Sequence, residues 1–431
     1  MALLDRPDPG QRRARRLRRL VAGATAVAAA LALGGCVTTS TWEPPQAGSS
    51  GLPGPSTPVG PSTIPSTLSG PSTGPTQSLE DACVQSTVAK LSLRQLVGQV
   101  LLVGVPIGDP SAIDDTLTEY QFGGVFLAGR YHDSASKLRS EISALQSTAK
   151  APTGVHLFIS LDQEGGDVQT LQGSDFPPIP TAVNQGKLTK SALYSQTASW
   201  ATLLADVGVN LDLAPVADTV PADLGTGNPP IGFYHRQYGS DPVAVASDIT
   251  TVVSAIQSTG VVTTLKHFPG LGRVLENTDT AAHAVDDVAT TDDPYLGPFV
   301  AGIKASTGAV MVSSATYPKL DPGSIATFSE PIVTGLLRDK LGFTGLIVSD
   351  SLAGAAAVAS VPVGQRAVKF IQAGGDLALV TTYTKAAAMF DGLLAAAQAS
   401  PSFTAKVTAA ATYVMHAKYV AGLLSCSPAR G

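Results

Sequence analysis

Eight apolar, β-branched stretches recur along residues 78–431, and helical patterns separate them. Strands buried on both faces read as continuous apolar runs, and alternating strands and helices predict a parallel sheet. Eight such units are the number that closes a (β/α)8 barrel, so we predict an α/β fold of this type. A doubly wound open sheet would satisfy the same pattern. The predicted strands are residues 97–105, 122–128, 155–161, 209–215, 261–266, 308–314, 344–349 and 375–381.

The length and charge of the chain argue against a second large domain and against a nucleic-acid-binding protein. Residues 78–431 are enough for one large α/β barrel and leave no room for a second large domain. The net charge is −5, and the lysines and arginines are scattered rather than gathered in a basic stripe. Binding to nucleic acid is therefore not expected.

The first 36 residues have the pattern of an export signal. An arginine-rich stretch at 12–19 precedes an apolar run at 20–33, and Leu33-Gly34-Gly35-Cys36 then resembles a lipobox. We predict that Cys36 becomes the first mature residue and carries a lipid anchor on the outer face of the cell membrane. A plain signal peptide and an uncleaved membrane helix are the alternatives, although the run is short for spanning a bilayer.

Residues 37–77 consist mainly of Pro, Ser, Thr and Gly, with loosely repeated Gly-Pro-Ser-Thr. Such a composition cannot form a core, so we predict a disordered linker between the anchor and the domain at 78–431. Two cysteines remain after Cys36, one near each end of this domain. An exported protein favours a disulfide between Cys83 and Cys426, and two buried thiols are the alternative.

Three of the predicted strands end in charged motifs. The run at 155–161 leads into Asp162-Gln163-Glu164-Gly165-Gly166, the run at 261–265 into Lys266-His267-Phe268-Pro269-Gly270, and the run at 344–348 into Ser349-Asp350-Ser351-Leu352. Side chains at the C-terminal ends of barrel strands converge on one site. We therefore expect these motifs to form a single catalytic site.

These motifs, in this order, resemble those of the family 3 glycoside hydrolases, in particular the short bacterial β-N-acetylhexosaminidases. The resemblance implies that Asp350 is the nucleophile, which attacks the anomeric carbon to form a glycosyl-enzyme. The alternative is that Asp350 only caps the following helix.

The resemblance also implies a set of substrate-binding side chains. Lys266 and His267 match the family pair that reaches sugar hydroxyls, Asp162 matches a carboxylate that accepts from the same sugar, and Arg236 matches an arginine that contacts the ligand. As alternatives, His267 could be a core histidine and Lys266 could pair internally with a carboxylate such as Asp212.

Two departures from the family pattern bear on activity. Where the family has an Asp-x-His acid/base dyad this chain has Asn277-Thr278-Asp279, and His283 follows four residues later. Asp279, His283 or neither could then be the acid/base. The second departure lies after Gly166, where both arginines of the family motif are missing. Thr170 takes the place of a ligand contact, which Arg273 or Arg130 could replace.

Together these features predict a monomeric, exported, lipid-anchored retaining glycosidase. The expected activity is that of a β-N-acetylglucosaminidase on cell-wall-derived or other amino-sugar oligosaccharides, without metal or organic cofactor. A sugar-binding lipoprotein that has lost its acid/base is the alternative from another class. A β-glucosidase or β-xylosidase of the same family is disfavoured, because those enzymes commonly take an acid/base from a second domain.

Overall fold

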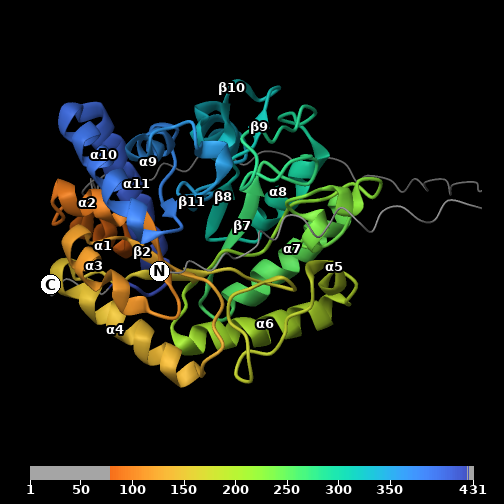
Figure 1. Ribbon diagram of the computed structural model, residues 1–431, viewed down its shortest axis with the longest axis horizontal. Coiled ribbons are helices and arrows are strands. Elements are labelled where there is room, and N and C mark those ends of the chain that lie inside the picture. The colour runs from red at the N-terminus through yellow and green to blue at the C-terminus, as the bar shows by residue number, and fades with distance from the viewer. Residues whose placement is uncertain (1–77, 425, 427–431) are drawn as a thin grey trace, which may run out of the picture. The chain divides into compact units, whose positions relative to one another are not determined.

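Eight parallel strands form the central sheet of the structure, a computed structural model that describes residues 78–424 and 426 (Figure 1). Their order is β11-β8-β7-β6-β3-β2-β1-β12, and a parallel bridge between Val348 and Leu377 joins the two ends. The predicted (β/α)8 barrel is thus confirmed, and the open sheet is excluded. The strands are β1 (Leu101–Pro106), β2 (Gly124–Ala128), β3 (Phe158–Leu161), β6 (Leu211–Asp212), β7 (Val262–Phe268), β8 (Ala309–Val312), β11 (Leu346–Ser349) and β12 (Ala378–Val380).

Burial explains why these strands are apolar throughout. Every residue of β3, β7, β8, β11 and β12 is buried, because the strands have side chains in the barrel interior on one face and against helices on the other. All eight predicted strands are present, each within or overlapping its predicted range. The predicted signal at 1–36 with Cys36, the predicted linker at 37–77, and residues 425 and 427–431 of the predicted domain lie outside the described residues.

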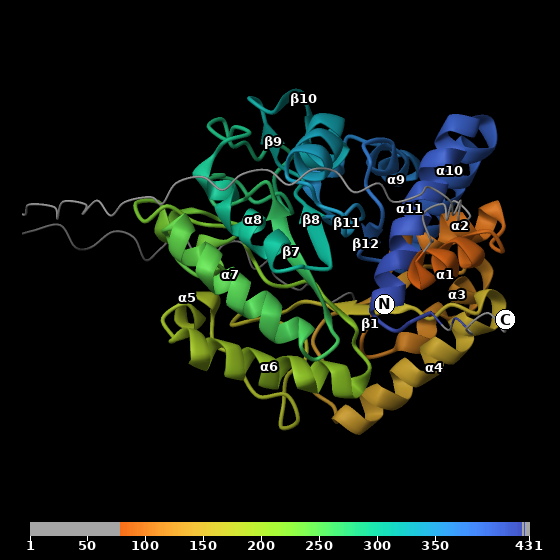
Figure 2. The same ribbon diagram turned by 180° about the vertical axis from the view of Figure 1, so that it is seen from behind.

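Helices surround the sheet (Figures 1 and 2). Several begin at a side-chain cap, such as Asp241, which accepts from the backbone of Val243 and Ala244 and is followed by Pro242 at the first helical position. No helix within residues 78–424 is long and apolar enough to cross a membrane. The helices are α1 (Leu79–Val88), α2 (Leu93–Gln99), α3 (Asp114–Tyr120), α4 (Ala135–Thr153), α5 (Ala182–Gln185), α6 (Lys190–Val207), α7 (Pro242–Gln257), α8 (Gly297–Lys304), the π-helix η7 (Pro331–Lys340), α9 (Val363–Gln372), α10 (Ala386–Ala399) and α11 (Pro401–Val420).

Shorter elements lie in the loops. Two hairpins, β4 (Gln163–Gly165) with β5 (Val168–Gln169) and β9 (Thr316–Tyr317) with β10 (Asp321–Ile325), follow β3 and β8 at their C-terminal ends. Neither hairpin was among the predicted elements. The 3₁₀ helices are η2 (Pro110–Ile113), η3 (Gly225–Gly227), η4 (Gly232–Tyr234), η5 (Pro294–Leu296), η6 (Ala326–Phe328), η8 (Ala356–Val358) and η9 (Tyr383–Lys385).

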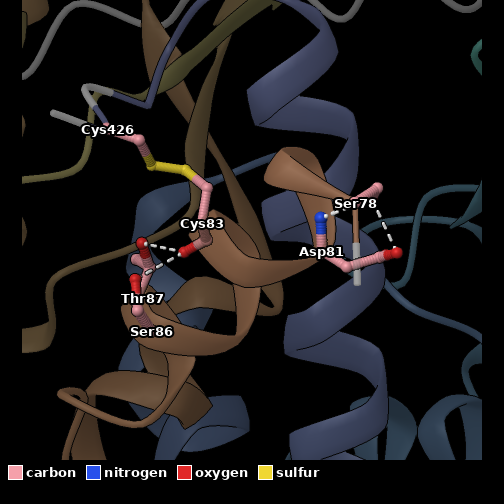
Figure 3. The surroundings of a disulfide bond; sticks show 6 residues. All are labelled: Ser78, Asp81, Cys83, Ser86, Thr87 and Cys426. Carbon is pink, nitrogen blue, oxygen red and sulfur yellow. Dashed lines mark hydrogen bonds between the residues drawn. A yellow bond between two sulfur atoms is a disulfide. The ribbon is translucent and has the colours of Figure 1, made fainter. Parts of the chain in front are cut away.

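The first and last parts of the described chain are joined covalently. In both views α1 and α2 (orange) pack beside α10 and α11 (blue). The predicted disulfide between Cys83 and Cys426 is present and joins α1 to the segment after α11 (Figure 3). The carbonyl oxygen of Cys83 accepts hydrogen bonds of 2.9 Å from the hydroxyls of Ser86 and Thr87. The alternative of two buried thiols is thereby excluded.

Candidate active site

A cavity of about 170 Å³ lies at the C-terminal ends of the barrel strands. It contains six of the seven side chains that the sequence assigned to catalysis or sugar binding, and only His283 is missing from its wall. The structure therefore brings the three motifs together at one cavity, as predicted. The cavity is lined by Phe126, Asp162, Leu213, Pro230, Arg236, Lys266, His267, Leu271, Asn277, Thr278, Asp279, Met311, Asp350, Ser351, Leu379 and Thr381.

Asp350 directly follows β11, and two hydrogen bonds to backbone groups fix its main chain and its side chain. Its N–H donates to the carbonyl oxygen of Val312 in β8 at 2.9 Å, and its Oδ1 accepts from the N–H of Ser351 at 2.7 Å. The next helices, η8 and α9, begin after Ala355 and Pro362 instead. Asp350 is therefore not the N-cap of the following helix, which was the alternative to its role as nucleophile.

Asp279 lies at the exposed rim of the same cavity. Its N–H donates to the side chain of Asn277 at 2.9 Å, and its carbonyl oxygen accepts from the N–H of Ala356 at 3.1 Å. Although much of the residue is exposed, the pKa of its carboxyl is raised, first because neighbouring groups displace water and second because Asp350 is negatively charged. His283 is exposed farther along the loop and does not line the cavity.

Two cations and two carboxylates form a cluster below the opening of the cavity. Lys266 in β7 is only 2% exposed, and its Nζ lies 2.6 Å from Asp162 Oδ1 and 2.5 Å from Glu164 Oε1. Arg236 donates to both oxygens of Glu164, from Nε at 2.8 Å and from Nη2 at 2.7 Å. Burial alone would raise the pKa of Glu164, but the charges of Arg236 and Lys266 lower it to about 2.

Glu164 is a residue of this cluster that sequence reasoning missed. The alternative considered for Lys266 was an internal ion pair with a carboxylate such as Asp212. Lys266 does form internal ion pairs, and its partners are Asp162 and Glu164. Burial instead raises the pKa of Asp212 to about 7. The signal that could have found Glu164 is its place in the same motif as Asp162, two residues farther along. Gly165 at the end of β4 and Gly166 in the following turn have φ of 105° and 58°, values that favour glycine.

His267 is oriented by a buried carboxylate. Its Nδ1 lies 2.8 Å from Asp218 Oδ2, and the other oxygen of Asp218 accepts from the N–H of Leu271 at 2.7 Å. Asp218 is fully buried, so it fixes both the imidazole ring and the start of the following loop. Because Nδ1 is occupied, Nε2 is the ring nitrogen left for a ligand in the cavity.

Neither arginine considered as a replacement at the Thr170 position lines the cavity. Arg273 pairs with Asp286 at 2.8 Å and Asp293 at 2.5 Å, and its guanidinium lies 4.4 Å from the Tyr295 ring centroid. Arg130 donates to the backbone carbonyls of Asp167 and Gln169. The loss of the family arginine is therefore not compensated by either side chain.

Within residues 78–424 and 426, no group of three or more His, Cys, Asp and Glu side chains is placed to hold a metal ion. The polar groups that line the cavity include carboxylates, cations and an imidazole. A (β/α)8 barrel with two carboxylates at the rim of a polar cavity, at the C-terminal ends of its strands, has the arrangement of a glycoside hydrolase.

Comparison with known proteins gives the family. The sequence profile of the glycosyl hydrolase family 3 N-terminal domain matches residues 92–417, so the chain belongs to this family of glycoside hydrolases. A β-hexosaminidase of Xanthomonas oryzae pv. oryzae is 35% identical over 292 residues, which cover 65% of this chain and 83% of the relative.

Solved structures agree with this assignment. The β-N-acetylhexosaminidase of Beutenbergia cavernae is 42% identical, with a TM-score of 0.74, and the match covers 77% of this chain and 99% of that one. A family 3 β-N-acetylglucosaminidase of a Paenibacillus species is 29% identical, with a TM-score of 0.68, over 79% of this chain and 65% of that one. The glycosidase class and the barrel expected from the sequence are therefore confirmed.

Proposed function

We propose that this glycoside hydrolase is a retaining β-N-acetylglucosaminidase that acts on cell-wall-derived or other amino-sugar oligosaccharides. The observation that carries the proposal is that Asp350 and Asp279 line one cavity and that the pKa of Asp279 is raised, first by loss of solvating water and second by the charge of Asp350. An ionised carboxylate and a carboxyl that keeps its proton are the two groups that retaining glycosidases need. The similar proteins from Beutenbergia and Paenibacillus, a β-N-acetylhexosaminidase and a β-N-acetylglucosaminidase, support the choice of sugar.

The reaction would proceed by double displacement. Asp350 attacks the anomeric carbon, and Asp279 gives its proton to the departing glycosidic oxygen, so that a glycosyl ester forms on Asp350. Asp279, now ionised, then takes a proton from water while the water oxygen attacks the same carbon. The Asp350–carbon bond breaks, which releases the sugar and returns both carboxyls to their starting states.

The cluster below the rim supplies groups for sugar hydroxyls. Lys266 uses two of its three donors on Asp162 and Glu164, and one remains. Arg236 uses two donors on Glu164 and one on the carbonyl oxygen of Pro230, which leaves two of five. Asp162 Oδ2 adds an acceptor and His267 Nε2 a further polar atom. Such fixed groups are suited to read a pattern of hydroxyls.

Two observations favour a second candidate, a sugar-binding protein with little activity. Thr170 replaces an arginine of the family motif, and neither Arg130 nor Arg273 reaches the cavity. The family histidine is also missing, so proton donation depends on Asp279. Binding of N-acetylglucosamine without hydrolysis of any N-acetylglucosaminide would favour this candidate over the enzyme.

A single experiment tests the enzymatic proposal. The protein is incubated with a 5-fluoro N-acetylglucosaminyl fluoride, which slows release of the glycosyl-enzyme, and is then analysed by peptide mass spectrometry. We expect one added sugar on the peptide that contains Asp350. Rapid turnover of substrate without such an adduct, or an adduct on another carboxylate, would contradict the mechanism.

We also propose that the protein is exported and held on the outer face of the cell membrane by a lipid on Cys36. The support is the sequence pattern of residues 12–36. Replacement of Cys36 by Ala should move the protein from the membrane fraction to the soluble fraction. Continued sedimentation of the variant with membranes would point to an uncleaved helix instead.

A further inference from the structure

We propose that Glu164 is a positioning residue, a buried carboxylate that aims Arg236 and Lys266 at the sugar without touching it. The inference rests on the proposed function, because it concerns how that site binds its substrate. Glu164 does not line the cavity, and its side chain is only 4% exposed. Its effect on a ligand must therefore pass through the two cations.

Geometry gives Glu164 control over both side chains at once. Oε1 lies 2.5 Å from Lys266 Nζ and 2.7 Å from Arg236 Nη2, and Oε2 accepts from Arg236 Nε at 2.8 Å. The fork of Arg236 therefore meets both carboxylate oxygens, which fixes the plane of the guanidinium. Without this contact the carbonyl oxygen of Pro230 would be the remaining hydrogen-bond acceptor described for Arg236.

Charge gives a second reason. Lys266 and Arg236 are both positive and contact the same oxygen, Oε1 of Glu164, at 2.5 Å and 2.7 Å, so the two cations lie close enough to repel each other. Glu164 contacts both and offsets this repulsion. Asp162 also contacts Lys266, but it lines the cavity, so its carboxylate is placed to meet the sugar itself.

The test replaces Glu164 by Gln, which has nearly the same shape but no charge. We expect KM for an aryl N-acetylglucosaminide to rise at least about tenfold, and Kd for free N-acetylglucosamine to rise in parallel, with a much smaller change in kcat. Asp248→Asn is the matched control, because it removes a buried carboxylate that pairs with the exposed Lys190 between α6 and α7, and neither residue lines the cavity. That variant should lose stability and keep its KM.

A double-mutant cycle separates positioning from a general effect on folding. If Glu164 acts through Arg236, then Glu164→Gln should raise KM less in an Arg236→Met background than in the wild type. If Glu164→Gln does not fold, Glu164→Asp serves instead, because its shorter carboxylate keeps the charge but cannot reach both cations. It should give a smaller rise in KM that is also reduced in the Arg236→Met background.

Unchanged KM and Kd, or an equal rise in both backgrounds, would overturn the role of Glu164. Measurements on the wild type distinguish failure of the proposed function from failure of the positioning role. A wild type that binds N-acetylglucosamine but hydrolyses no N-acetylglucosaminide would contradict the enzyme, and the change in Kd on Glu164→Gln would still decide the positioning role. A wild type with no affinity for the sugar would overturn both.

Discussion

The backbone N–H of Ala356 donates to the carbonyl oxygen of Asp279 at 3.1 Å, and the neighbouring N–H of Ala357 donates to Thr278 at the same distance. Two loops far apart in sequence are joined by these bonds. One carries the proposed proton donor and the other begins at the proposed nucleophile, Asp350. Their attachment to each other keeps the two carboxyls on the rim of one cavity, which matters because acid and nucleophile act in the same step.

Replacement of Asp350 by Asn should abolish hydrolysis while the fold persists. An amide cannot form the glycosyl ester, and Asn can still accept from the N–H of Ser351, as Oδ1 does now at 2.7 Å. We expect turnover of an aryl N-acetylglucosaminide to fall below about one per cent of the wild-type rate, with an unchanged circular dichroism melting curve. Asp339→Asn, on the exposed side of η7, is the control. Retention of more than a few per cent of activity by Asp350→Asn would exclude it as the nucleophile.

The Asp279→Ala and His283→Ala variants should differ sharply. A general acid matters most for a poor leaving group, so loss of Asp279 should slow hydrolysis of a disaccharide by about 10²–10⁴-fold and that of an activated aryl glycoside far less. Added azide should partly restore release of the glycosyl-enzyme on the aryl substrate, because an anion needs no general base. His283→Ala should remain near wild type. The reverse pattern would identify His283 as the general acid.

The raised pKa of Asp279 predicts the alkaline side of the pH profile. The acid must hold its proton to donate it, so kcat/KM for a disaccharide should fall as the pH rises through this pKa. Because the pKa is raised, the fall should come at a higher pH than the 3.8 of an ordinary Asp. The pH at which the rate falls is found from initial rates measured from about pH 3 to about pH 9, since burial can raise the pKa of a carboxyl as far as about 9. A profile that is unchanged in Asp279→Ala would argue against this residue.

Lys418 should make stability depend on pH. It is fully buried, its amine donates to Gln99 Oε1 at 2.8 Å, and burial lowers its pKa from 10.5 to about 7. Between these values the unfolded chain binds a proton that the folded chain does not, so unfolding free energy should rise with pH from about 7 to 10.5 and stay level below 7.

Lys418→Met should flatten this rise and raise stability at neutral pH by an amount on the order of a few kcal/mol, less the loss of the bond to Gln99. Urea unfolding at a series of pH values provides the measurement. Lys406→Met, on the same helix with its amine near the surface, is the matched control. An equal slope in wild type and Lys418→Met would mean that the lysine is charged throughout.

Loss of the disulfide should lower stability by about 2–5 kcal/mol. Cys83 and Cys426 are separated by 343 residues, so the bond restricts nearly the whole unfolded domain. Thermal unfolding of the Cys83→Ser and Cys426→Ser variants should show equal losses, and the double variant no further loss. Alkylation of both cysteines in the native protein without reductant would contradict the bond.

The barrel could be predicted because its strands are buried on both faces and are therefore marked by continuous apolar residues. Even β6, which has only Leu211 and Asp212, lies within the predicted range 209–215. The hairpin at Gln163–Gln169 could not be predicted in this way, because its short strands carry no such run.

Single side chains were harder to predict than strands. Sequence placed Asp162, Lys266 and Asp350 at one site, since strand ends converge. It could not choose the partner of Lys266, because several carboxylates lie within reach and only tertiary packing brings Glu164 closest. The same holds for Asp279 and His283, whose order along the chain does not reveal which one the contact with Ala356 holds at the rim.

The disulfide also has a mechanical consequence. Cys83 lies only five residues after Ser78, where the described domain begins. A pulling force applied at that end meets a covalent link within α1, after its first four residues, and the disulfide transmits the load to Cys426 in the segment after α11. While the bond is intact, residues 83–426 form a covalently closed loop, so a force applied across the two ends of the domain cannot extend the barrel that lies within it.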